Sequence, residues 1–149
     1  MIATDQVAHR MTAIGTYPTG LGRWTWMTFC DKNNIMLRVV TGYRPCEAPG
    51  ISTTYQQQLR YFRGNNDNRD PRTAFYEDLF QDVSVWKQEG DRIIIGLDAN
   101  EDVRKGETSN FFQAVGMKEA ILNSHTGRDP PATYNRNMNR EPIDGMWVT

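Results

Sequence analysis

The stretch that decides the fold is RIIIGLDAN, residues 92–100. Its apolar part, residues 93–97, is short and rich in β-branched side chains, which is typical of a strand buried on both faces of a sheet. Asp98 and Asn100 follow at the carboxyl end of this strand. If the extended geometry continues, side chains at positions i and i+2 point the same way. We therefore expect Asp98 and Asn100 to face one cleft together.

A helix precedes this strand, and a β-hairpin precedes the helix. Residues 70–86 begin with Asp-Pro, an N-cap followed by proline at the first helical position, and then carry an apolar stripe that stops at Gly90. Residues 22–30 and 35–40 flank the turn sequence DKNN and predict two antiparallel strands. Strand, helix and strand in this order predict a layered α/β domain.

Weaker patterns complete the chain. A second helix is expected from Ser52 or Thr53 to Phe62, and a short helix around residues 111–115 ends at Gly116, where a left-handed cap is expected. An Arg- and Asn-rich loop is predicted over residues 135–140, and a strand over residues 143–148.

Length and composition limit the number of domains. The chain has 149 residues, of which 38% are hydrophobic and 23% charged, so we expect one folded domain or part of a larger one. We assign residues 1–22 to a poorly defined N-terminal segment and residues 23–149 to a partial domain. The net charge of -1 provides no general attraction to nucleic acid or to an anionic membrane, so any polyanion binding must be local.

The cysteines and the apolar stretches indicate the cellular setting. Cys30 and Cys46 lack both metal-ligand spacing and the density of a disulfide scaffold, so we predict two buried thiols. Residues 1–10 lack the apolar core of a signal peptide, and no stretch approaches the ~20 apolar residues of a membrane span. We therefore expect an intracellular protein, cytoplasmic or nuclear, without a membrane partner.

The pair Asp98 and Asn100 can do chemistry, although an isolated Asp-x-Asn is more often a turn or a helix cap. A carboxylate can orient a water molecule or bind a hard cation, and a neighbouring amide can bind an anionic oxygen. A calcium loop starting at Asp98 is excluded, because its sixth and twelfth positions, which need Gly and Glu, hold Val103 and Ser109.

Four segments in order resemble the endonuclease/exonuclease/phosphatase superfamily, including its retroelement-type and AP-endonuclease-like members. They are TGYRP at 41–45, IIIGLDAN at 93–100, TY at 133–134 and IDGMWV at 143–148. The resemblance covers most of the chain from Arg23 onward. It implies an α/β (α+β) fold that is part of a four-layer α/β/β/α sandwich with mixed sheets. It also implies Mg²⁺- or Mn²⁺-dependent hydrolysis of phosphate esters at the strand ends.

The resemblance also implies roles for individual residues. Asp98 would orient or deprotonate the attacking water and contact the metal, and Asn100 would help to hold the water and the phosphate. Tyr43 matches the tyrosine that reaches the phosphate, and Asp144 matches the acid that orients a histidine. Each match has a simpler reading, because Tyr43 could be a plain aromatic of the core or groove and Asp144 a turn residue.

Substrate-binding residues are expected near the carboxyl-terminal end of the chain. Thr133 and Tyr134 match a threonine and an aromatic beside the substrate groove, although they could simply begin a strand. Arg128, Arg136 and Arg140 are interleaved with Tyr134 and asparagines, a composition that could follow a phosphate backbone. A solvated loop is the alternative interpretation of these arginines.

The chain departs from the superfamily pattern at both ends. The Asn and Glu motifs expected early are not found in residues 1–22, and no Ser-Asp-His segment follows Asp144. We therefore expect an incomplete site, and we interpret His9 and His125 as surface residues. The expected function is that of an endonuclease-like phosphodiesterase acting on nucleic acid, with DNA preferred to RNA as the expected substrate. The alternatives are a non-catalytic domain that binds nucleic acid or protein and a small-molecule phosphatase; exposed sheet edges could also favour self-association.

Overall fold

The structure is a computed structural model that describes residues 2–125, 131–136 and 139–149. Its elements are, in chain order, α1 (Asp5–Ala8), β1 (Met11–Thr16), β2 (Trp24–Cys30), β3 (Met36–Tyr43), α2 (Thr54–Gly64), α3 (Pro71–Gln88), β4 (Arg92–Asp98), α4 (Gly106–Ala114), β5 (Lys118–Glu119), α5 (Ala120–Ser124), β6 (Tyr134–Arg136), β7 (Asn139–Glu141) and β8 (Asp144–Val148).

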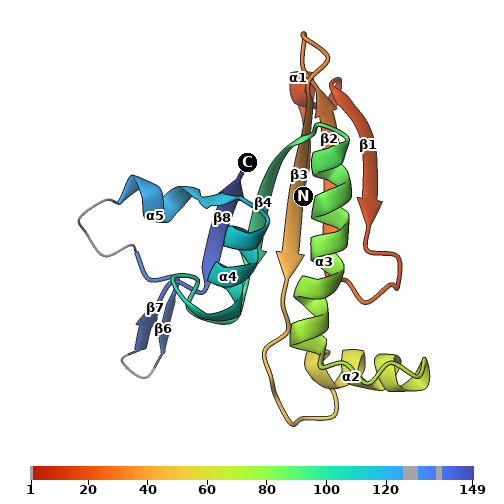
Figure 1. The fold of residues 1–149 in the computed structure, drawn as a ribbon, viewed down its shortest axis with the longest axis vertical. Helices are drawn as coiled ribbons and strands as arrows, with labels where there is room; N and C mark the ends of the chain where they lie inside the picture. The colour runs from red at the N-terminus through yellow and green to blue at the C-terminus, as the bar shows by residue number, and fades with distance from the viewer. Residues whose placement is uncertain (1, 126–130, 137–138) are drawn as a thin grey trace.

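One mixed sheet organises the molecule. Its six strands lie in the order β1-β2-β3-β4-β8-β5, and β3 and β4 form its parallel pair, while the other neighbours are antiparallel. β6 and β7 form a separate two-stranded hairpin. In Figure 1 the long helix α3 and the shorter α4 lie on the same side of the sheet. The mixed sheet with its helices confirms the predicted α+β class, and the four-layer sandwich stays a prediction.

Local sequence explains the helices between β3 and β4. The Asp70 carboxylate caps α3 by accepting the backbone N–H of Arg72 at 2.8 Å and of Thr73 at 3.3 Å, and Gly90 ends the helix region at φ 86°. Thr53 caps α2 through a hydrogen bond from the Gln56 N–H at 3.3 Å. These helices form the crossover that a parallel pair of strands requires.

The two faces of the sheet differ in burial. The face toward α3 and α4 carries Trp24, Val40, Ile93, Ile95, Leu97 and Trp147, which belong to one continuous core. Phe112 of α4 stacks on Trp147 with 3.9 Å between ring centroids. A Cβ on Gly145 would meet the Trp147 ring at 2.4 Å, so glycine leaves room for this stack. We call the opposite side the open face. One of its cross-strand rows is Ile14, Met27, Val39, Ile94 and Val148.

Several sequence-based expectations need correction. β4 is not buried on both faces, because Ile93, Ile95 and Leu97 are buried whereas Ile94 and Gly96 are only half-buried. Both cysteines are free thiols as predicted, but Cys46 is exposed and Cys30 half-buried, because they lie at a loop and at a strand end. The segment predicted as a loop over residues 135–140 contains parts of β6 and β7. β1 was not predicted; it pairs with β2 along the sheet edge.

Candidate active site

Three of the predicted site residues lie in one cross-strand row. Tyr43 at the end of β3 pairs with Asp98 at the end of β4, and Asp98 pairs with Asp144 at the start of β8. Directly paired residues have side chains on the same face of a sheet, so all three belong to the open face. Tyr43 is 38% exposed, Asp98 half-buried and Asp144 exposed. A phenol and two carboxylates therefore converge at the edge where β3 and β4 end.

The Asp98 carboxyl has an altered proton affinity. Burial raises its pKa, the nearby Asp144 carboxylate acts in the same direction, and the backbone N–H of Asn100 acts against both. A carboxylate with a raised pKa is a stronger base than an ordinary aspartate. Asp98 is thus suited to accept a proton from a water molecule.

Asn100 is held in a tight turn instead of in an extended strand. β4 ends at Asp98, and Asn100 has a left-handed φ of 49°, so the expected continuation of extended geometry is not observed. The Asn100 backbone N–H donates to Asp98 Oδ1 at 3.2 Å, which is the turn that the simpler reading of Asp-x-Asn predicts. The Asn100 side-chain amide donates to the backbone carbonyl of Arg44 at 2.7 Å. This amide therefore fixes the strand exit beside Tyr43.

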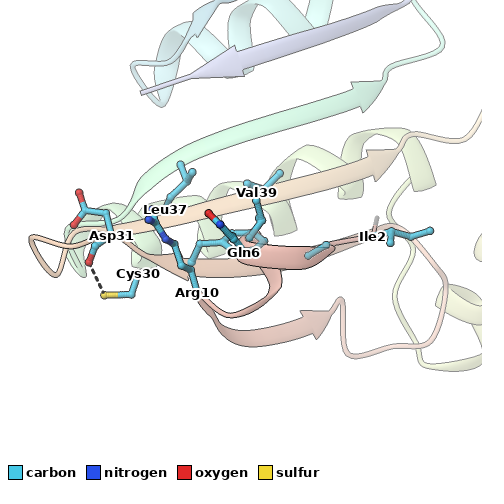
Figure 2. A pocket seen from close by; sticks show the side chains of 10 residues that line it. Ile2, Gln6, Arg10, Cys30, Asp31, Leu37 and Val39 are labelled. Carbon is cyan, nitrogen blue, oxygen red and sulfur yellow. Dashed lines mark hydrogen bonds between the residues drawn. The ribbon is translucent and has the colours of Figure 1, made fainter.

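A hollow on the sheet borders Tyr43. It has a volume of about 340 Å³, and its lining includes Thr16, Thr25 and Thr41, which occupy one cross-strand row. A second cavity of about 540 Å³ lies at the opposite end of the open face, between the N-terminal segment and β2 and β3. Figure 2 shows Gln6 of that segment near Val39 of β3. We place the site at the strand ends, because the paired carboxylates and the phenol lie there.

The expected substrate-binding residues lie on and beside the β6–β7 hairpin. Thr133 Oγ1 accepts the backbone N–H groups of Ile143 at 3.0 Å and of Asp144 at 3.1 Å, so Thr133 anchors the start of β8. Tyr134, 37% exposed, begins β6.

The arginines of this region are placed only in part. Arg136 ends β6 and Arg140 lies in β7, but their side chains lie outside what the structure describes. Arg128 lies outside the described residues altogether. The hairpin itself lies near the edge where β4 ends and β8 begins (Figure 1).

The carboxylate oxygens of Asp98 and Asp144 are ligands of the type that a hard cation prefers. Within the described part of the chain, no group of three or more His, Cys, Asp and Glu side chains is arranged to hold a metal ion. Asp98 and Asp144 form a pair of carboxylates. Mg²⁺ commonly takes one or two carboxylates and fills its remaining positions with water and substrate phosphate. The residues present therefore fit a magnesium-like ion.

Residues behind the turn were missed by sequence reasoning. Arg44 is 1% exposed in its side chain and pairs with Glu101 at 2.8 Å and with Glu107. Arg44 appeared in the sequence only as part of a strand exit, and Glu101 only as part of a rejected calcium loop. A charged residue inside the Tyr-Arg-Pro exit gives no local signal of burial, because arginine is usually exposed.

Nothing in the described chain resembles a membrane anchor of the helical kind. No helix in residues 2–125, 131–136 or 139–149 combines the length and the apolar character needed to cross a bilayer. Of the two histidines, His9 is exposed at the end of α1, and His125 follows α5 and is half-buried.

Comparisons of sequence and structure give different results. No protein-family model matches the sequence, and no curated protein matches it. The human Nocturnin catalytic domain with bound sulfate anion matches with a TM-score of 0.52 and 16% identity, over 84% of this chain and 40% of that chain. Truncated Caenorhabditis elegans TDP2 matches with a TM-score of 0.57 and 12% identity, over 93% of this chain and 52% of that chain.

An endonuclease/exonuclease/phosphatase family protein from Bacteroides thetaiotaomicron also matches, with a TM-score of 0.48 and 15% identity, over 84% of this chain and 40% of that chain. The chain thus spans about half the length, or less, of these solved structures. At such low identities the similarity shows the fold alone, and Nocturnin and TDP2 carry that conclusion.

Proposed function

Because the chain has the fold of the endonuclease/exonuclease/phosphatase superfamily, we propose that it carries the catalytic strand ends of a metal-dependent phosphodiesterase that hydrolyses nucleic-acid phosphodiester bonds, DNA before RNA. The single observation that supports the proposal most is the row Tyr43, Asp98 and Asp144 on one face of the sheet. Hydrolysis of a phosphodiester needs an activated water, positive charge near the phosphate and donors aimed at its oxygens.

The residues of the row divide these tasks. Asp98 accepts the proton of the attacking water. The Tyr43 hydroxyl donates a hydrogen bond to a phosphoryl oxygen, and Asp144 provides a second carboxylate for the cation. A bound Mg²⁺ or Mn²⁺ supplies positive charge at the phosphate and lowers the pKa of a coordinated water.

Local features of the site edge agree with a nucleic-acid substrate. The net charge of -1 gives no general attraction to a polyanion. Arg136 and Arg140 lie on the β6–β7 hairpin, near the edge that carries the row. Phosphate contacts from such arginines would hold the backbone while Asp98 acts on the bond.

The test is a plasmid-nicking assay with Mg²⁺ or Mn²⁺. It uses the chain and a form extended by the sequence that flanks it in its gene, each with Asp98→Asn. Glu77→Gln is the matched control, because Glu77 is an exposed carboxylate on α3. We expect nicking to fall at least about 100-fold in Asp98→Asn, the size typical of a lost general base, and to stay unchanged in Glu77→Gln.

The outcomes separate the candidate functions. Nicking that requires metal and Asp98 supports the proposal. A well-folded extended form that leaves the plasmid intact overturns it, and binding of DNA by that inert form assigns the chain to the non-catalytic alternative.

A further inference from the structure

A cluster of charged side chains around one buried arginine lies directly behind the turn that carries Asp98 and Asn100. Its centre is Arg44, whose side chain is 1% exposed. Its acidic members are Glu101, which is 22% exposed in its side chain, and Glu107, which is 54% exposed. Arg72 joins the cluster from the first turn of α3 and pairs with Glu101 at 3.3 Å. Nothing in the proposed chemistry uses these four residues directly.

The Arg44 guanidinium is satisfied in every direction. Nη1 donates to Glu101 Oε2 at 2.8 Å and to the Ala99 carbonyl at 3.5 Å, Nη2 donates to Glu107, and Nε donates to the Arg72 carbonyl at 3.3 Å. Its central carbon also lies 4.8 Å from the centroid of the Tyr76 ring. A planar fork with several donors is a property of arginine that lysine lacks.

Arg44 also contacts each residue of the catalytic turn through backbone or side-chain groups. The Arg44 N–H donates to the Asp98 carbonyl at 2.9 Å, its guanidinium reaches the Ala99 carbonyl, and its own carbonyl accepts the Asn100 side-chain amide at 2.7 Å. The turn has strained geometry, because Asn100 is left-handed with φ 49°. Such a conformation persists where the surroundings hold it.

Glu101, the acidic partner of Arg44, is itself held by Thr108 through its other carboxylate oxygen. Glu101 Oε1 accepts the backbone N–H of Thr108 at 2.7 Å and also its hydroxyl, which in turn contacts the Tyr76 hydroxyl. Burial alone would raise the pKa of Glu101, but the hydrogen bonds from Thr108 and the charge of Arg44 outweigh it and lower the pKa. Glu101 is therefore ionised at neutral pH and holds Arg44 in place.

We propose that Arg44 is a positioning residue: its guanidinium, held by Glu101 and Glu107, fixes the Ala99 carbonyl and thereby the turn from Asp98 to Asn100, without touching the substrate. The inference rests on the proposed function for its catalytic consequence. Its structural part stands on the contacts alone, because the guanidinium reaches the Ala99 carbonyl and the Arg44 backbone carbonyl accepts the Asn100 side-chain amide.

Arg38 provides a matched control at the other end of the same strand. It is 9% exposed in its side chain, pairs with Asp91 at 2.7 Å and Glu89 at 3.3 Å, and its central carbon lies 4.4 Å from the centroid of the Trp26 ring. Arg38 and Arg44 thus share burial, two acidic partners and an aromatic neighbour. Arg38 has no contact with the catalytic turn in the described structure.

The experiment compares Arg44→Lys with Arg38→Lys by NMR of the Asn100 side-chain amide. Both variants should lower the thermal midpoint by similar amounts, because each loses a fork of hydrogen bonds from a buried guanidinium to two carboxylates. We expect the Asn100 amide signal to shift and its hydrogen exchange to become faster in Arg44→Lys, and to stay unchanged in Arg38→Lys. Unchanged Asn100 signals in a folded Arg44→Lys protein would overturn the inference.

A milder variant covers the case in which Arg44→Lys does not fold. Glu107→Gln weakens the hold on Arg44 at an exposed position, so we expect the same shift of the Asn100 signal with a smaller size. An Asn100 signal identical to that of the wild type in Glu107→Gln counts against the inference in that case.

Kinetics give the second readout where the wild type nicks DNA. In Arg44→Lys we expect kcat to fall roughly tenfold with KM within about twofold, since a misplaced catalytic group costs rate more than binding. Arg38→Lys should keep both values. Equal losses of kcat in the two variants would reduce Arg44 to a stabilising residue. A well-folded extended form that does not nick DNA defeats the proposed function, while the Asn100 signal still decides the positioning role.

Discussion

The two faces of the central sheet use the same strands for different purposes. In β8 the residues alternate, so that Trp147 is 2% exposed against α4 while its neighbour Met146 is 44% exposed on the open face. The covered face carries stacked aromatics such as Phe112 on Trp147. The open face carries Tyr43, Asp98 and Asp144. Apolar packing that stabilises the fold is thus concentrated on one face, and the polar side chains of Tyr43, Asp98 and Asp144 lie on the other.

This division explains how a strained and partly desolvated site can persist. A carboxylate that is partly buried beside another carboxylate destabilises the folded state. In this chain Asp98 is such a group, and the aromatic packing behind the strand ends offsets its cost. Substitutions on the two faces should therefore change the free energy of unfolding by different amounts. At Asp98 the change should also have the opposite sign.

The largest effect is expected for Trp147→Ala. It removes a fully buried ring that stacks on Phe112 at 3.9 Å, and such truncations cost about 3–5 kcal/mol. Chemical denaturation measures the loss. The control is Met146→Ala, one residue earlier on the open face, which should cost less than about 1 kcal/mol. Similar losses for the two variants would remove the distinction between the faces.

A smaller loss of stability is expected for Thr133→Val. The change keeps the shape of the side chain but removes the oxygen that accepts the N–H groups of Ile143 and Asp144. Because Thr133 is exposed, water replaces part of this hydrogen bonding, and we expect a loss of about 1 kcal/mol in unfolding free energy. Faster amide exchange at residues 143 and 144 would locate the effect, and unchanged exchange there would refute the anchoring role.

The smallest effect on stability is expected for Asp98→Asn, and it is a gain instead of a loss. The folded pKa of Asp98 is raised above its unfolded value, so the folded state binds more protons than the unfolded chain between the two values. Stability therefore falls as pH rises through that window. At pH 7 the variant should gain less than about 1 kcal/mol, after allowance for solvent screening.

Below the ordinary aspartate pKa of about 3.9 the gain from Asp98→Asn should disappear, because both states are then protonated. Urea denaturation at a series of pH values tests this dependence. A variant that is less stable than the wild type at pH 7 would show that Asp98 is stabilised by partners and would contradict the raised pKa.

The sequence predicted those parts of the fold that depend on local signals. The caps Thr53 and Asp70 and the turn before β3 are each encoded within a few residues, and the structure confirms them. The strand register, which brings Tyr43, Asp98 and Asp144 into one row, was not predicted. β1 was missed because the sequence MTAIGT has no clear apolar alternation.

The remaining features depend on contacts between distant residues. The left-handed Asn100 is held by the Arg44 carbonyl, 56 positions away in the chain. The burial of Arg44 requires Glu101 to approach from the segment after β4 and Glu107 from the first turn of α4. Neither contact leaves a periodic pattern, and the sequence predicted an extended Asp98–Asn100 segment instead of a turn.

The order of strands in space has a consequence for biosynthesis. β8 is the last of the sheet strands in the chain, yet it inserts between β4 and β5. During translation β4 therefore keeps one unpaired edge until residues 144–148 leave the ribosome, and such an edge attracts other strands. Asp98 acquires its second carboxylate, Asp144, in the same event. Pairing of the two carboxylates is coupled to closure of the sheet, so a nascent chain cannot bring Asp98 and Asp144 together before that edge is protected.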